Sequence, residues 1–160
     1  MGYALFPLVI LMVFAGLIAQ AGGLAMSTLG AGPVGLAETN ADVAADRAVS
    51  YADACVRTAI ANPGLTGESI VTQLPLGVIA PHGAVCKIDA APNGGRVVYA
   101  WAPVVPGAIE KIRAVTDAGE TWFVISTAPG VASGIVDGAT HTVPAAVPFR
   151  SVLYQAEVRP

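Results

Sequence analysis

The residues best suited to covalent chemistry are two cysteines, Cys55 and Cys86. They do not form a C-x-x-C motif, so the sequence favours a disulfide over a metal site. A single disulfide in a small domain is typical of an oxidising compartment. The alternative is two unpaired thiols, because free cysteine often fills a core as a small apolar residue. A disulfide would place this part of the chain outside the cytosol.

A second group could in principle support nucleophilic catalysis. Ser133, Asp137 and His141 lie close together in the sequence around a predicted hairpin. They lack a nucleophile elbow and an evident oxyanion hole, which favours the interpretation that they are surface residues of a turn. The other histidine, His82, is remote in sequence, and two histidines alone do not make a zinc site.

Two further sequence patterns resemble motifs of binding or catalytic sites but lack the neighbouring elements that such sites need. Residues 30–35 match G-x-G-x-x-G, but they follow an apolar segment rather than a strand and contain Pro33. A dinucleotide-binding loop needs a strand before it and a helix after it, so a flexible linker explains these glycines better. Asp42 and Asp46 lie one helical turn apart, which is typical of a solvated helix face rather than acid–base machinery.

The N-terminal segment differs from the rest of the chain because no charged residue precedes Glu38. At about 1.5 Å per residue, a helix over residues 3–26 would cross a hydrocarbon core of roughly 30 Å. We therefore predict a transmembrane anchor over residues 1–26. A cleaved signal peptide is the alternative, since residues 19–21 (Ala-Gln-Ala) form a small-x-small cleavage site, although a basic n-region is missing.

The remainder is predicted to be a Gly-rich linker over residues 27–37 and one exported domain over residues 38–160. The formal net charge is −3, and the eight basic residues are scattered singly. No basic stripe exists that could follow a phosphate backbone, which argues against nucleic-acid binding. The charged fraction of 12% is about half the usual value, as expected of a surface covered by partners.

Helical periodicity predicts an amphipathic helix that starts near Asn40 and ends at residues 62–64 (Asn-Pro-Gly). Its predicted inward side is mostly small and consists of Ala45, Ala48, Val49, Ala52, Cys55, Val56, Ala59 and Ile60. Small side chains there would allow close approach to a sheet.

Downstream patterns predict an α+β domain with a largely antiparallel sheet. A short helix is expected from Pro106 to Gly119, with Ile109, Ile112 and Val115 on one face. Strands are expected over residues 70–73, 85–89, 96–101, 121–126, 135–136, 140–143 and 147–152. Asp137-Gly138 marks a tight turn.

Several features follow one another in a distinctive order: the uncharged N-terminus, residues 62–64 (Asn-Pro-Gly), 74–77 (Leu-Pro-Leu-Gly) and 98–101 (Val-Tyr-Ala-Trp), and a Pro-rich C-terminal third. This order resembles the PilM family, small membrane-anchored proteins encoded with type IVB thin pili, notably those of conjugative plasmids. The resemblance implies a role in pilus biogenesis, as an associated protein or a minor, pilin-like subunit. The chain departs from pilins in its leader, because the only early glycine is Gly2 and the fifth residue after it is Pro7 rather than glutamate.

These observations together favour a non-enzymatic protein of the bacterial inner membrane, single-pass, with its C-terminal domain in the periplasm. The expected partners are the lipid bilayer and other pilus-assembly or pilin subunits, with no cofactor, metal or small-molecule substrate. A secreted periplasmic binding or accessory module is the alternative. Within the anchor, a face with little side-chain bulk could pack against another membrane helix; its residues are Ala15, Gly16, Ala19, Gly22 and Gly23.

Overall fold

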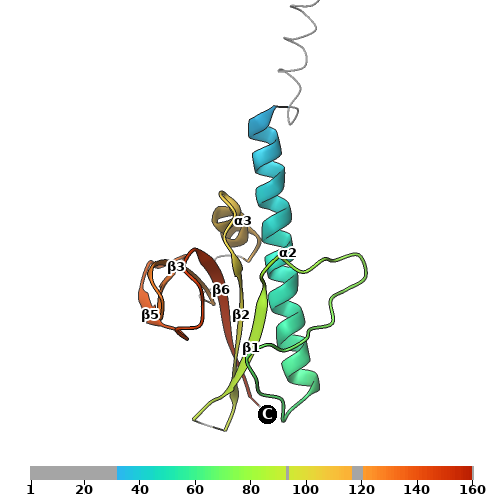
Figure 1. The fold of residues 1–160 in the computed structure, drawn as a ribbon, viewed down its shortest axis with the longest axis vertical. Helices are drawn as coiled ribbons and strands as arrows, with labels where there is room; N and C mark the ends of the chain where they lie inside the picture. Colours follow the sequence, from blue (N-terminus) through green and yellow to red (C-terminus); the bar gives the residue numbers. More distant parts are fainter. Residues whose placement is uncertain (1–31, 93, 117–120, 160) are drawn as a thin grey trace, which may run out of the picture. The chain divides into compact units, whose positions relative to one another are not determined.

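The structure is a computed structural model that describes residues 32–92, 94–116 and 121–159. These residues contain two helices and six strands in an α+β arrangement (Figure 1). In chain order the elements are α2 (Pro33–Ala61), β1 (Val85–Ala90), β2 (Arg96–Pro103), α3 (Ala108–Val115), β3 (Trp122–Ala128), β4 (Val131–Gly134), β5 (Thr140–Thr142) and β6 (Ser151–Val158). The predicted anchor lies outside the described residues.

All six strands form one antiparallel sheet in the order β1-β2-β6-β3-β4-β5. The last strand of the chain, β6, therefore lies between β2 and β3. It pairs with β2 along its whole length, from Arg96 opposite Val158 to Pro103 opposite Ser151. Its pairing with β3 is shorter and covers only residues 122–124.

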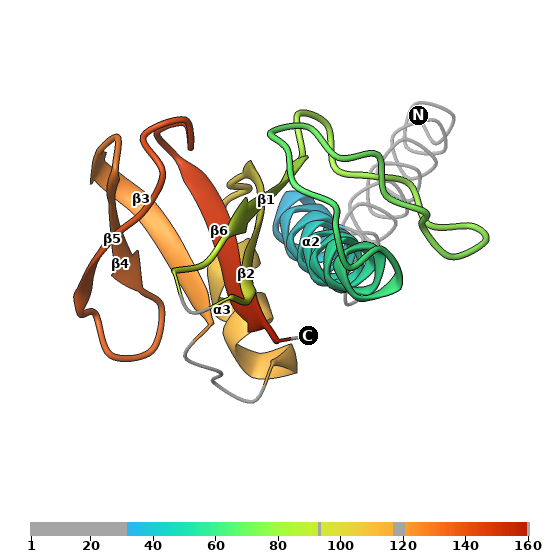
Figure 2. The ribbon, with the colours of Figure 1, turned by 90° about the horizontal axis from the view of Figure 1, so that it is seen from below.

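Helix α2 covers the face of the sheet formed by β1, β2 and β6 (Figure 2). It can lie close because its buried side chains are mostly small, as the periodicity predicted. Side chains alternate between the two faces of a strand, so Val98 and Ala100 of β2 point to the helix side. The core between helix and sheet also contains Ile88, Ile112 and Trp122.

A second core lies on the opposite face of the sheet. Trp101 of β2 and Leu153 of β6 pack there against Phe123 and Ile125 of β3. Val147, which precedes β6, is fully buried in the same cluster. Burial on both faces explains why β2 is almost continuously apolar instead of alternating with polar residues.

The start of α2 differs from the prediction. The helix begins at Pro33 rather than near Asn40, so residues 33–37, predicted as linker, are helical. Proline is well tolerated in the first helical turn because its missing N–H needs no partner there. Two predicted core residues also differ, since Ile60 of α2 and Val115 of α3 are each 59% exposed.

Three strand predictions are wrong in position. Residues 70–73 form no strand, and only Gly67 makes an isolated bridge, with Ile88. The fourth strand ends at Gly134 rather than covering residues 135–136, because the hairpin turn takes residues 135–139. The last strand starts at Ser151 rather than 147, since the residue before it, Arg150, has φ 62° and interrupts an extended backbone.

Candidate interaction site

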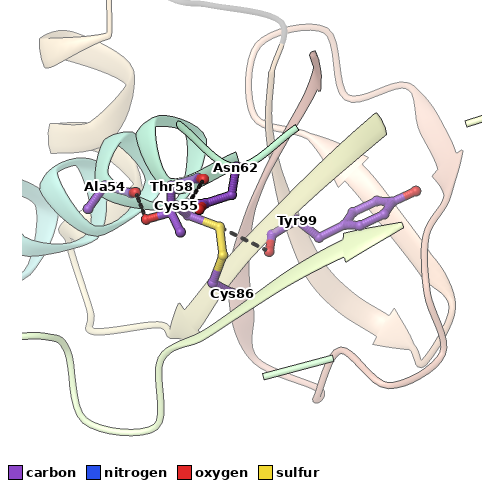
Figure 3. The surroundings of a disulfide bond; sticks show 6 residues. All are labelled: Ala54, Cys55, Thr58, Asn62, Cys86 and Tyr99. Atoms are coloured by element: carbon purple, nitrogen blue, oxygen red, sulfur yellow. Dashed lines mark hydrogen bonds between the residues drawn. A yellow bond between two sulfur atoms is a disulfide. The ribbon is translucent and has the colours of Figure 1, made fainter. Parts of the chain in front are cut away.

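The C-terminal half of α2 is fixed to the sheet by a disulfide between Cys55 and Cys86 (Figure 3). Their Cα atoms are 5.8 Å apart, and both residues are fully buried. The Cys55 sulfur lies 4.0 Å from the carbonyl oxygen of Tyr99, a packing contact because a disulfide sulfur carries no proton. The bond ties α2 to β1 across residues 56–85.

A second attachment holds the end of α2, through hydrogen bonds from the guanidinium of Arg96 on β2. Its Nη1 donates to the carbonyl oxygens of Ala59 at 2.6 Å and Asn62 at 2.8 Å. The last carbonyls of a helix have no partner within the helix, and a cation there also complements the helix dipole. This buried arginine was missed from the sequence, where it looks like the first residue of a strand.

The segment between α2 and β1, residues 62–84, is anchored at its base. Gly67 exchanges two backbone hydrogen bonds of 2.9 Å with Ile88, and the Ile70 N–H donates to the Cys86 carbonyl at 2.8 Å. Lys87 Nζ lies 3.3 Å from Glu68 Oε1 and 3.2 Å from Asp89 Oδ2. Burial lowers the pKa of Lys87, but the hydrogen bonds that its ammonium donates to these two carboxylates, together with their negative charge, outweigh burial and raise the pKa, so the ammonium stays charged.

A tyrosine of α2 contributes to the same attachment. Tyr51 is buried in the core between helix and sheet, and burial raises the pKa of its phenol although a hydrogen bond with Thr72 acts in the opposite direction. The neutral phenol therefore connects α2 to residues 62–84 at physiological pH.

Beyond this base, residues 71–79 expose apolar side chains. The Val78 N–H donates to the Pro75 carbonyl at 3.1 Å, and Gly77 at φ 84° completes the turn. This geometry matches a type II turn, which needs φ > 0 at its third residue and so favours glycine there. Leu76 at its second position is fully exposed.

We call the exposed aliphatic residues of this segment the apolar loop tip; Val71, Leu76 and Ile79 are 89%, 105% and 66% exposed. No charged residue occurs between Glu68 and Lys87. Uncharged aliphatic residues gathered on one loop are unfavourable in water and mark a candidate interaction site. The sequence signal was the length of this uncharged run, although part of it was predicted to be a strand.

Between this segment and α2 lies a cavity of about 480 Å³. Its lining combines Ala54, Arg57 and Ala61 of α2 with Leu65 and Val71 of residues 62–84. Arg57 pairs with Asp53 at 2.9 Å, but both side chains are more than half exposed, so this ion pair adds little stability. Val71 belongs to both the apolar loop tip and the cavity lining, so the two features adjoin.

The residues considered for catalysis occupy the β4–β5 hairpin and a separate turn. Asp137 Oδ1 accepts from the Ala139 N–H at 3.0 Å, so this carboxylate stabilises the hairpin turn. His141 on β5 packs edge-on against Phe123, with ring centroids 4.8 Å apart. His82 lies in the turn of residues 81–84. The predicted membrane-packing residues Ala15, Gly16, Ala19, Gly22 and Gly23 are outside the described residues.

Within the part of the chain that the structure describes, no helix is both long and apolar enough to cross a bilayer. Comparisons with models of known families and with curated proteins gave no match. Among solved structures, the fold is similar to that of a protein described as PilM from Escherichia coli B7A. The TM-score is 0.55 at 16% sequence identity, and the alignment covers 74% of this chain and 93% of the other. The two proteins thus share an α+β fold.

Proposed function

We propose that this protein is a non-enzymatic component of type IVB pilus biogenesis, either a pilus-associated protein or a minor, pilin-like subunit. The observation that carries the proposal is the fold shared with the PilM protein from Escherichia coli B7A over nearly all of that chain. The sequence resemblance to the PilM family supports the same role independently of the fold.

The proposed location is the bacterial inner membrane, with one membrane span and the C-terminal domain in the periplasm. The uncharged residues preceding Glu38 support the span. The disulfide between Cys55 and Cys86 supports the periplasmic side, since cytosolic thiols are kept reduced.

The proposed partners of the domain are pilus-assembly or pilin subunits, and the apolar loop tip is the surface proposed for them. Its aliphatic side chains would lose contact with water on docking, and there is no charge on the tip whose desolvation would oppose this.

The experiment is deletion of the gene in the strain that carries it, with complementation by the full-length chain. We expect surface pili counted by electron microscopy to be lost and restored, while the major pilin remains present on an immunoblot. Normal pilus numbers after deletion would refute the pilus role.

A further inference from the structure

A second cavity, of about 270 Å³, lies between α2, α3 and the end of β2. Its floor and walls are apolar and include Ala44 and Ala48 of α2, Ile109 and Ile112 of α3, and the end of β2. One wall is the turn of residues 81–84, in which the Ala84 N–H donates to the Pro81 carbonyl at 3.0 Å. The cavity is therefore built from elements that the fold already fixes.

The charged part of the lining is one cation, the guanidinium of Arg47. Arg47 of α2 and His82 of the turn both line the cavity, and no aspartate or glutamate is among the described residues that do so. The nearby carboxylate of Asp42 is engaged, at 2.9 Å from Lys111 Nζ of α3. A guanidinium beside an apolar cavity favours a ligand that combines an apolar group with a carboxylate.

The volume limits the size of that apolar group. Pockets for drug-sized ligands and cofactors usually measure roughly 300–1,000 Å³, and this cavity falls below that range. One aliphatic side chain such as leucine fits inside it, and such a side chain is the kind of anchor that binds in a pocket at a protein interface.

We propose that this cavity binds one aliphatic side chain of a partner protein, with Arg47 pairing with a carboxylate next to that side chain on the partner. The proposal does not depend on the pilus role, since it rests on the size, the lining and the charge of the cavity alone. The cavity differs from the apolar loop tip, because the tip would insert its own side chains into a partner, whereas the cavity would bind a side chain of the partner.

The test is photo-crosslinking of the full-length protein in lipid nanodiscs with acetyl-glycyl-photoleucine, which carries a free carboxylate. We expect saturable labelling of peptides from the cavity lining, mapped by mass spectrometry, and about fivefold weaker apparent affinity for the C-terminal amide of the same probe. Arg47→Gln should lower the apparent affinity for the carboxylate probe by a similar factor. Arg113→Gln changes an exposed arginine of α3 that does not line the cavity, and this variant should leave the apparent affinity for the carboxylate probe unchanged.

A second pair of variants tests the cavity itself. Ala44→Leu should narrow the cavity and reduce labelling at least fivefold, whereas Ala61→Leu at the C-terminal end of α2 should not. Labelling that fails to saturate, or that neither Arg47→Gln nor Ala44→Leu reduces, would overturn the proposal. The proposal would also be overturned if myristate reduced labelling at a lower concentration than unlabelled acetyl-glycyl-leucine does, because the site would then prefer an acyl chain.

Discussion

At the scale of single residues, Cys86 and Arg96 decide where the C-terminal half of α2 lies. Cys86 bonds covalently to Cys55 in the C-terminal half of the helix, and Arg96 holds the carbonyls at the helix end. A helix whose buried face is mostly alanine gains little from each side chain it buries, since alanine has little apolar surface. These two attachments compensate for that weakness.

The disulfide is expected to contribute about 3–4 kcal/mol to the free energy of unfolding, because it closes a loop with a sequence separation of 31. The variant with both Cys55→Ser and Cys86→Ser should lose this amount in urea denaturation of the full-length protein. We also expect the disulfide to be present in protein isolated from cells. Equal thiol labelling of the denatured, membrane-extracted protein with and without prior reductant would contradict it.

Replacement of the capping arginine, Arg96→Met, should lower the free energy of unfolding by at least about 2 kcal/mol. Hydrogen bonds from charged donors contribute about 1.5–3 kcal/mol, and the carbonyls of Ala59 and Asn62 would lose their partner. The matched control is Arg113→Met on the exposed surface of α3, which should change stability by less than about 0.5 kcal/mol. Equal losses in the two variants would argue against the capping role.

At the scale of elements, the segment between α2 and β1 separates a structural base from an exposed tip. The base is held by backbone bonds to β1 and by the contacts of Lys87, whereas the tip makes its own turn. This division predicts that substitutions at the tip affect binding without affecting folding.

The variant with Leu76→Ser and Ile79→Ser should therefore fold normally and fail to restore piliation in the deletion strain. Both side chains are exposed, so their loss should change the free energy of unfolding by less than about 0.5 kcal/mol. The control is Val115→Ser, which removes a comparably exposed aliphatic side chain from α3 and should restore pili. Full complementation by the tip variant would show that this surface is not needed.

Elements with local signals were predictable, and those fixed by long-range contacts were not. The 3.6-residue pattern of α2 and the apolar run of β2 identified both elements in the sequence. The position of β6 was missed because the apolar residue Val147 suggests a strand, while in the fold it fills the second core from a turn. Arg96 carries no local signal at all, since its partners lie 37 and 34 residues earlier.

At the scale of the whole molecule, the sheet order shows why the C-terminus matters to stability. Strand β6 lies between β2 and β3, so the last strand of the chain joins the hairpin of β1 and β2 to the rest of the sheet. Such an order depends on contacts between distant residues, which slow folding. The sequence predicted an antiparallel sheet but contained nothing that would reveal this order.

The same scale includes the N-terminal segment, whose role can be tested only in the full chain. If Ala15, Gly16 and Ala19 present a close-packing face to another membrane helix, bulky side chains should prevent the contact. Gly16→Leu with Ala19→Leu should keep the protein in the membrane, since leucine is favourable in lipid, and reduce surface pili by at least tenfold.

Leu11→Val with Val13→Leu is the control, because it exchanges aliphatic residues in the same segment without filling the small-residue face. The experiment first needs an intact mass of the membrane-extracted protein that includes the segment. A species that begins at Gly22 would instead identify a cleaved signal peptide and a released periplasmic module. If the segment is retained and the leucine variant makes normal pili, the small residues serve only to anchor the domain, and the contacts proposed for the pilus role are then expected in residues 38–160.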